Sequence, residues 1–247
     1  MSPAPDRARV DLWEVALDAL PVTDATFNGA LGMLSSRERE RAGRLRRPAD
    51  RRHAVLRWAL LRHLLGGYLG EPGASVALIT SPAGKPSLAR DSALQFNLSH
   101  RGGLVLYAFT WGRPVGVDLE QARPVAEADE IVASLCAPEE ARRYAALPAR
   151  LRPHAFLHLW TCKEAYVKGT GEGLALGLDR FVVGGSDDRA RVRRLDGSPL
   201  GRDDWHLCGL WVDAAHRGAV ACRGAPPELL RRRVTHWPTR ERVVRPR

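Results

Sequence analysis

The hydrophobic spacing between residues 155 and 168 is that of a helix. Apolar residues recur there near helical intervals, with no intervening proline or glycine: Phe156, Trp160, Tyr166 and Val167. In a helix, Glu164 lies one turn after Trp160 and Lys168 one turn after Glu164. The pattern therefore predicts a helix that carries these three residues on neighbouring positions of one side.

A second segment, residues 115–120, alternates as a strand does. Three apolar residues occupy one set of positions, and Gly116, Asp118 and Glu120 occupy the other. Because side chains alternate between the two faces of a strand, both carboxylates lie on one face. Gly116 lies on that face too, and we expect its missing side chain to leave room for a bulky anion.

The rest of the pattern indicates an α+β fold in two halves of similar size. A capping box at Ser35-Ser36-Arg37-Glu38 predicts the start of a helix, and residues 94–120 together predict a three-stranded meander. Residues 21–28 are rich in turn formers. Strands are predicted at 10–17, 76–80, 94–98, 104–111, 180–183, 191–195, 205–212 and 218–223, and helices at 35–45, from Pro48 to Gly66-Gly67, and at 138–146.

Composition and charge narrow the class of protein. The 247 residues are 45% apolar, which is ordinary for a globular protein. No apolar run near the start has the length of a signal peptide, and none elsewhere can span a bilayer, so we expect a cytoplasmic protein without a membrane partner. The four cysteines lack metal-ligand spacing, which argues against a zinc site.

The net charge of +10 comes almost entirely from arginine, because the chain has 35 arginines and only three lysines. Residues 228–247 alone hold seven arginines against two glutamates. This basic segment is either disordered or docks an acidic partner. Elsewhere, the positive charge suits nucleic acid, a phosphorylated small molecule or an acidic protein surface equally well.

Three carboxylates, two from the predicted strand and one from the predicted helix, could form one site. Asp118, Glu120 and Glu164 would supply an all-oxygen, open-sided set of ligands, which suits a hard cation such as Mg²⁺. Taken separately, each segment has an ordinary explanation. Glu164 and Lys168 could be a surface ion pair, and Asp118 and Glu120 could be the solvated face of an edge strand.

Other candidate binding residues lie in loops and at strand ends. Lys85, one of the three lysines, is held in a stiff Gly-Lys-Pro loop. Ser99 and His100 place a hydroxyl and an imidazole at the end of the strand that begins at Leu94, although a turn-capping pair would look the same. The helix after Pro48 carries several basic residues, which an ordinary solvated face would also carry.

The sequence Gly116-Val117-Asp118-Leu119-Glu120, followed some forty residues later by Trp-x-x-Lys-Glu-Ala-x-x-Lys, resembles the paired signature of the 4'-phosphopantetheinyl transferases. Gly84-Lys85-Pro86 and Asn97–His100 precede it in the order expected of the long, surfactin-synthetase-activating type. The resemblance covers roughly residues 35–223.

The resemblance implies two pseudo-symmetric subdomains, each a small, mainly antiparallel sheet packed with helices, with the active site in the cleft between them. We expect an N-terminal subdomain at 1–113, a C-terminal one at 114–225 and a basic tail at 226–247. The length points to the monomeric long class rather than to the short trimeric one.

The resemblance also implies an activity, namely Mg²⁺-dependent transfer of the 4'-phosphopantetheine arm of coenzyme A to a serine of an apo acyl or peptidyl carrier protein. Adenosine 3',5'-bisphosphate is the other product. Carrier proteins of this kind are typically acidic, which suits the positive net charge.

The resemblance and the chemistry together assign roles to the site residues. Asp118, Glu120 and Glu164 would bind Mg²⁺; Glu164 would also accept the serine proton, with Lys168 orienting it or stabilising the leaving phosphate. Coenzyme A would be held by Lys85, Ser99, His100 and Arg52. The resembled family usually has an arginine for coenzyme A at the position that His53 occupies in this chain. Either Arg52 or His53 could therefore supply this basic group.

Two other functions fit part of the sequence. A basic nucleic-acid-binding protein would use the arginine-rich helices, but its aromatic residues would be interleaved with the arginines, and here they are not. A Mg²⁺-dependent phosphohydrolase would use the same carboxylates and release phosphate without a protein acceptor.

Overall fold

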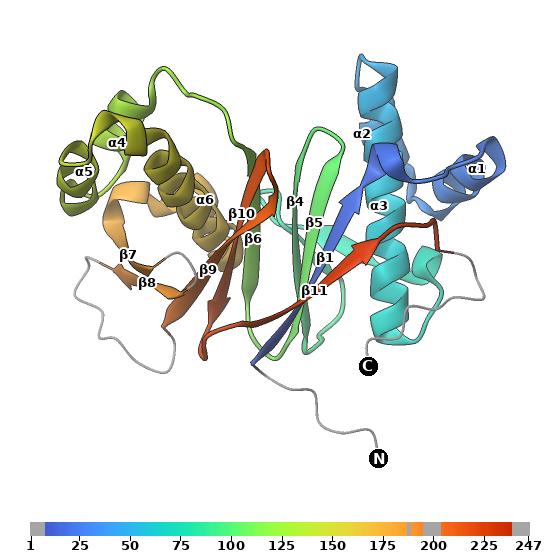
Figure 1. Ribbon diagram of the computed structural model, residues 1–247. Coiled ribbons are helices and arrows are strands. Elements are labelled where there is room, and N and C mark those ends of the chain that lie inside the picture. Colours follow the sequence, from blue (N-terminus) through green and yellow to red (C-terminus); the bar gives the residue numbers. More distant parts are fainter. Residues whose placement is uncertain (1–7, 187–188, 195–203, 239–247) are drawn as a thin grey trace.

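The computed structural model describes residues 8–186, 189–194 and 204–238. Two β-sheets lie at the centre of the molecule, and a long helix covers the outer face of each (Figure 1). This arrangement confirms the predicted α+β class, with two sheet-and-helix halves. No helix of the described residues is long and apolar enough to cross a membrane.

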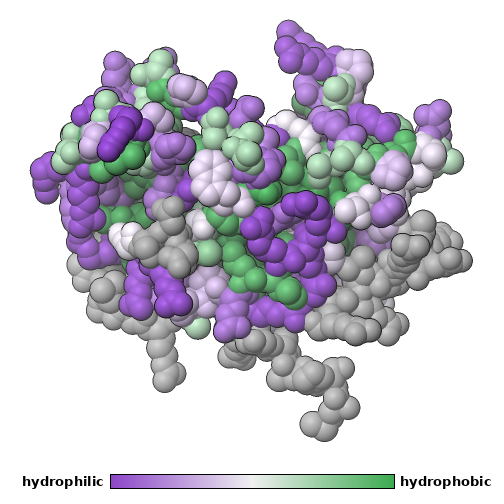
Figure 2. Space-filling view, in the orientation of Figure 1, coloured by the Kyte–Doolittle hydropathy of each residue, from purple (hydrophilic) through white to green (hydrophobic). Residues whose placement is uncertain are grey.

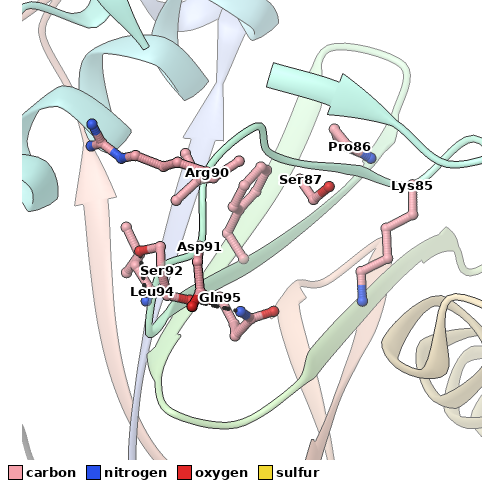
Figure 3. A pocket seen from close by; sticks show the side chains of 10 residues that line it. Lys85, Pro86, Ser87, Arg90, Asp91, Ser92, Leu94 and Gln95 are labelled. Carbon is pink, nitrogen blue, oxygen red and sulfur yellow. Dashed lines mark hydrogen bonds between the residues drawn. The ribbon is translucent and has the colours of Figure 1, made fainter. Parts of the chain in front are cut away.

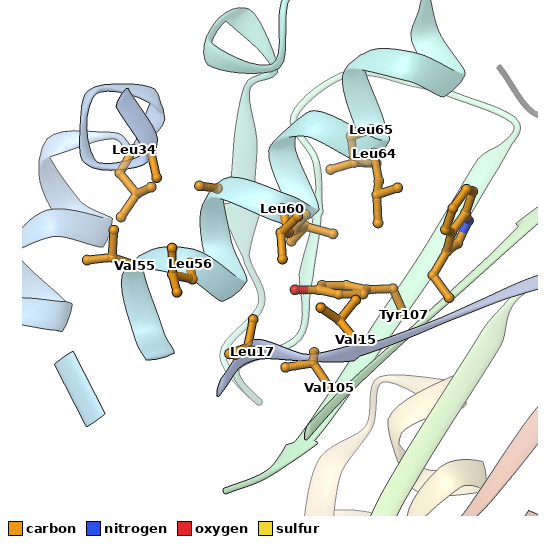
Figure 4. Close-up of a cluster of buried hydrophobic side chains, with 14 of the residues drawn as sticks. Val15, Leu17, Leu34, Val55, Leu56, Leu60, Leu64, Leu65, Val105 and Tyr107 are labelled. Carbon is orange, nitrogen blue, oxygen red and sulfur yellow. The ribbon is translucent and has the colours of Figure 1, made fainter. Parts of the chain in front are cut away.

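The first half contains a four-stranded sheet with the order β11-β1-β5-β4, in which β1 and β11 are parallel and the other pairs antiparallel. Its core lies between the sheet and α3 (Figure 4). The elements of this half are β1 (Arg9–Ala16), α1 (Asp24–Met33), α2 (Ser36–Gly43), α3 (Pro48–Leu69), β2 (Leu78–Thr80), β3 (Pro86–Leu88), β4 (Leu94–Arg101), β5 (Leu104–Trp111) and β11 (Glu228–Val234).

The helices of this half begin and end where local chemistry requires. The Ser35 hydroxyl accepts a hydrogen bond from the Glu38 backbone N–H, and the Glu38 carboxylate accepts one from the Ser35 backbone N–H. This pair of hydrogen bonds is the predicted capping box. α3 runs past Gly66 and ends at Gly70, whose φ of 70° is the left-handed conformation that favours glycine at a helix end. Hydrophilic surface covers the end of the molecule around α2 and the start of α3 (Figure 2).

The second half contains an antiparallel sheet with the order β6-β10-β9-β8-β7, and α6 packs on it. A third apolar cluster lies between the two sheets and includes Leu12 and Leu106 from the first and Val117 and Val220 from the second. The elements are β6 (Val115–Gln121), α4 (Ala128–Leu135), α5 (Pro138–Ala145), α6 (Arg152–Thr170), β7 (Phe181–Ser186), β8 (Arg189–Arg194), β9 (Trp205–Asp213) and β10 (His216–Arg223).

The three-stranded meander predicted for residues 94–120 is wrong. β4 and β5 pair as expected, but β6 pairs with β10 in the other sheet. β6 still passes beside β4, where the Asn97 side-chain oxygen accepts a hydrogen bond of 3.0 Å from the Val117 N–H. Strand alternation fixes which face is buried but not which strand is the neighbour, so the sequence pattern could not distinguish the two arrangements.

Part of the basic C-terminal segment is neither disordered nor free. Residues 228–234 form β11 at the edge of the first sheet, parallel to β1. There, Arg231 contacts Glu14 at 2.5 Å, and Arg232 lies 3.7 Å from Asp11. The arginines that looked like a tail therefore neutralise two buried acids of β1. The limits 1–113, 114–225 and 226–247 stay a prediction.

Three further elements were missed, and one of them is the short strand β3, which begins at the proline of the Gly-Lys-Pro loop. The turn-rich stretch after Pro21 contains α1, which Thr23 caps through the Thr26 N–H. α4 was not predicted; unlike α2, which starts at a capping box, and α5, which starts at a proline, it has no side-chain cap at its start. Leu195, the last residue of one predicted strand, lies outside the described residues.

Candidate active site

Asp118 is the centre of a polar cluster between the two halves. Its carboxylate is only 2% exposed on β6, and Oδ1 accepts from Lys168 Nζ at 2.5 Å and from the Ser99 hydroxyl at 3.1 Å. Lys168 Nζ also lies 3.1 Å from Ser99 Oγ. β4, β6 and α6 thus bring together three of the predicted site residues.

Gly116 allows β6 to approach α6 closely enough to form this cluster. A Cβ atom at Gly116 would lie 2.0 Å from the Ala165 carbonyl oxygen and 2.4 Å from the Gly169 nitrogen. The expectation that Gly116 leaves room for an anion is wrong, because the backbone of α6 fills that space.

We expect Gly116→Ala to lower the free energy of unfolding by about 1–3 kcal/mol, since the strand and the helix must separate to admit the methyl group. Urea denaturation measures this change. Gly32→Ala is a matched control, because nothing lies within 4 Å of a Cβ at that helical position. Equal stability of Gly116→Ala and the wild type would contradict the close packing.

Glu120 and Glu164 extend the acidic cluster around Asp118. Burial raises the pKa of both carboxyl groups, and the negative charge of Asp118 raises each pKa further. Lys168 opposes both shifts, and Arg101, 3.6 Å from Glu120, opposes the one at Glu120. Both carboxyl groups therefore bind a proton more readily than they would in water.

The donor set fits a hard cation. Asp118 Oδ2 is buried without a hydrogen-bond partner within the described part of the chain, and the two glutamates near it repel the charge of Asp118. In the present arrangement, no three His, Cys, Asp or Glu side chains of the described residues form a group that could hold a metal ion. Lys168 forms an ion pair with Asp118 in this arrangement. The carboxylates are therefore ligands of the kind that Mg²⁺ prefers, but they do not form a preformed metal site.

Lys85 joins the two halves near this cluster. Its Nζ donates to the Gly169 carbonyl at 2.7 Å, at the end of α6, and lies 3.4 Å from the Val115 carbonyl. Burial lowers the pKa of Lys85 to about 8. Lys85 also lines a pocket of about 130 Å³ together with Ser87, Arg90 and Gln95 (Figure 3).

His100 lies on β4 next to Ser99, among positive charges. Partial burial and the charges of Arg57, Lys168, His53 and Arg101 lower the pKa of His100 to about 4. Arg52 is not part of this group, since its guanidinium donates to the Val22 carbonyl at 3.2 Å and lies 5.3 Å from the centre of the Phe27 ring.

Sequence reasoning gave no individual role to Asn97 and Lys163, two motif residues that support the site. Asn97 links β4 to β6, as described above. Lys163, next to Glu164, is fully buried, and its Nζ lies 2.7 Å from Glu140 Oε2. Such a position cannot be recognised from sequence, because a lysine is almost never fully buried unless it is paired.

The carboxylate–lysine centre lies between the two sheet-and-helix halves and is built from the motifs on which the resemblance to the transferases rests. Two family models support this class. One, described as the 4'-phosphopantetheinyl transferase superfamily, matches residues 114–217; the other, described as 4'-phosphopantetheinyl transferase, N-terminal, matches residues 21–111.

Curated relatives agree. The chain is 38% identical over 170 residues to the 4'-phosphopantetheinyl transferase HetI of a Nostoc strain, covering 67% of this chain and 70% of that protein. It is 29% identical to the 4'-phosphopantetheinyl transferase Sfp of Bacillus subtilis, covering 66% and 71%. A crystal structure of the Thermotoga maritima holo-[acyl-carrier-protein] synthase matches 45% of this chain and 62% of its own, with 17% identity and a TM-score of 0.36.

The chain therefore belongs to the 4'-phosphopantetheinyl transferase superfamily. Within that superfamily it is a 4'-phosphopantetheinyl transferase of the long class to which Sfp belongs.

Proposed function

We propose that this enzyme transfers the 4'-phosphopantetheine group of coenzyme A to a serine of an apo acyl or peptidyl carrier protein, giving holo carrier protein and adenosine 3',5'-bisphosphate. The observation that carries the proposal is the cluster at Asp118, which gathers acidic and basic groups from both halves. A diphosphate substrate needs both kinds of group, since its charge must be neutralised while a proton is removed from the attacking hydroxyl.

Asp118, Glu120 and Glu164 are the residues that would hold Mg²⁺. When bound, the ion supplies positive charge to the phosphate oxygens during transfer. Asp118 Oδ2, which has no partner among the described residues, is the oxygen best placed to serve as a ligand.

Glu164 is the proposed proton acceptor. The carrier serine oxygen forms a bond to the phosphorus that bears the pantetheine arm, and the bond from that phosphorus to the oxygen of the departing nucleotide breaks. Glu164 takes the serine proton, directly or through water. Lys168, one turn further along α6, contacts Asp118 and Ser99 and stabilises charge on the leaving phosphate.

Lys85, Ser99 and His100 are proposed to hold the nucleotide end of coenzyme A. Within the described part of the chain, Lys85 Nζ donates only to backbone carbonyls, so no carboxylate neutralises its charge and an anionic ligand can do so.

We expect coenzyme A to bind about tenfold more weakly at pH 9 than at pH 7, because Lys85 carries its charge below its pKa of about 8 and loses it above. Lys85→Arg should remove this dependence, since arginine stays charged throughout. Isothermal titration calorimetry at both pH values measures the two dissociation constants. The same fall in affinity for Lys85→Arg would show that another group titrates.

The partner follows from the reaction and the charge. A net charge of +10 favours an acidic carrier protein as the acceptor. A monomeric state and a cytoplasmic location stay predictions.

Product analysis tests the proposal against the two alternatives. The enzyme should release adenosine 3',5'-bisphosphate from coenzyme A only when an apo carrier protein is present, and EDTA should stop the release. Release without a carrier would favour the phosphohydrolase. Salt-sensitive binding to nucleic acid that is independent of Asp118 would favour the nucleic-acid-binding protein.

A further inference from the structure

The two sheets meet edge to edge along the seam between β4 and β6, and no backbone ladder joins these strands. β4 ends the first sheet and β6 ends the second, so among the described strands each pairs with one neighbour in its own sheet. The two strands nevertheless pack against each other. Side chains must supply polar partners across the seam, because a buried backbone N–H or C=O group without a partner costs free energy.

Three side chains of the first half bridge the seam. Asn97 Oδ1 accepts a hydrogen bond of 3.0 Å from the Val117 N–H, and the Ser99 hydroxyl donates one of 3.1 Å to Asp118 Oδ1. Lys85 Nζ lies 3.4 Å from a backbone carbonyl oxygen of β6. Asn97 and Ser99 lie on one face of β4, since they are two residues apart. The bond from Asn97 therefore fixes the residue that directly precedes Asp118.

Asn97 differs from the other two bridging residues because it has no second role. Lys85 and Ser99 are proposed to hold coenzyme A, so the bound nucleotide competes with β6 for their hydrogen bonds. Asn97 is not among the proposed ligands of coenzyme A, and it is only 3% exposed. A hydrogen bond this well buried has little competition from water. The bond from Asn97 is therefore the bridge for which neither water nor coenzyme A competes.

We infer that Asn97 is a positioning residue for the transfer reaction, which holds β6 at the seam so that Asp118 meets Ser99 and Lys168. The inference rests on the proposed function and assigns Asn97 no contact with the substrate. Without the Asn97 oxygen, the Val117 N–H loses its partner, and β6 shifts to find another acceptor. A displacement of about 1 Å at a reacting group can lower a rate by about 10²-fold.

The first test separates the rate of transfer from the binding of coenzyme A. Asn97→Ala should lower kcat for carrier modification by about 10- to 100-fold. The dissociation constant of coenzyme A for the full-length protein, measured by calorimetry without Mg²⁺, should stay within about threefold of the wild type, because the lost contact acts only on the reacting arrangement. Asn97→Leu keeps most of the side-chain volume and should give the same two results, which separates loss of the oxygen from loss of packing.

Thr110→Val is the matched control for the loss of a buried hydrogen bond. Thr110 is 2% exposed, and its hydroxyl donates to the Arg9 carbonyl at 3.2 Å, within the first sheet. Urea denaturation should show similar losses of stability for Thr110→Val and Asn97→Ala, while only Asn97→Ala slows the transfer. Equal slowing by both variants would show that general destabilisation lowers kcat, and this result would overturn the inference.

A double-mutant cycle with Asp118→Asn adds a readout that a purely structural role would not change. If Asn97 acts through Asp118, Asn97→Ala should lower the rate of Asp118→Asn by less than about threefold. Losses that multiply in the double variant would overturn the inference, and so would a folded Asn97→Ala protein with the wild-type kcat. A wild type that binds coenzyme A but modifies no carrier protein would overturn the proposed function and the role of Asn97 together, which distinguishes that failure from failure of the inference alone.

Discussion

Asp118→Asn is expected to lower the rate of phosphopantetheine transfer by about 10²- to 10³-fold, as loss of one charge-stabilising group does in other active sites. The amide keeps the size of the carboxylate but removes the negative charge that Lys168 contacts at 2.5 Å and that would help to hold Mg²⁺. Because Asp118 is only 2% exposed, solvent screens this charge little, and its loss is felt in full. Initial rates of carrier modification measure the effect.

The matched control for Asp118→Asn is Asp213→Asn, which makes the same change on β9, where Asp213 pairs with His216. This variant should keep the wild-type rate, since neither residue belongs to the polar cluster. Transfer by Asp118→Asn at more than half the wild-type rate would remove Asp118 from the centre of the mechanism.

Lys163→Met is expected to lower the free energy of unfolding by about 3–5 kcal/mol, the usual cost of removing one partner of a buried ion pair. Lys163 Nζ lies 2.7 Å from Glu140 Oε2 and donates to the carbonyls of Leu178 and Phe181 at 2.7 and 2.9 Å. The Glu140 side chain is 2% exposed. Without Lys163, the charge of Glu140 remains buried, and among the described residues only the backbone N–H groups of Ala137 and Val183 donate to it.

The double variant Lys163→Met/Glu140→Leu separates this cost from general damage to the core. Replacing both charges with apolar side chains leaves no unpaired charge, so most of the lost stability should return. Urea denaturation of the wild type, both single variants and the double variant gives the coupling free energy. A loss of less than 1 kcal/mol in Lys163→Met would mean that Lys163 is not held as described.

The site residues that could be predicted from sequence are those whose spacing alone determines which face of a helix or strand their side chains share. A helical period puts Glu164 and Lys168 on one side of α6, and strand alternation puts Asp118 and Glu120 on one face of β6. Both predictions needed only local geometry, which the chain carries in its own pattern.

What could not be predicted depends on contacts between distant segments. β6 alternates equally well whether it pairs with β5 or with β10, and Gly116 gives no sign that a helix backbone fills its vacant side. The arginines of β11 were assigned to a segment that is disordered or docks an acidic partner, because the acids that they pair with lie on β1, more than 200 residues earlier.

The intact mass of an apo carrier protein, measured after incubation with this enzyme, coenzyme A and Mg²⁺, tests the central claim most directly. We predict a gain of one phosphopantetheine group, located on a serine, which EDTA prevents and which Asp118→Asn slows. An unchanged mass for acyl and peptidyl carriers alike, with the enzyme folded and coenzyme A intact, would contradict the proposed transfer.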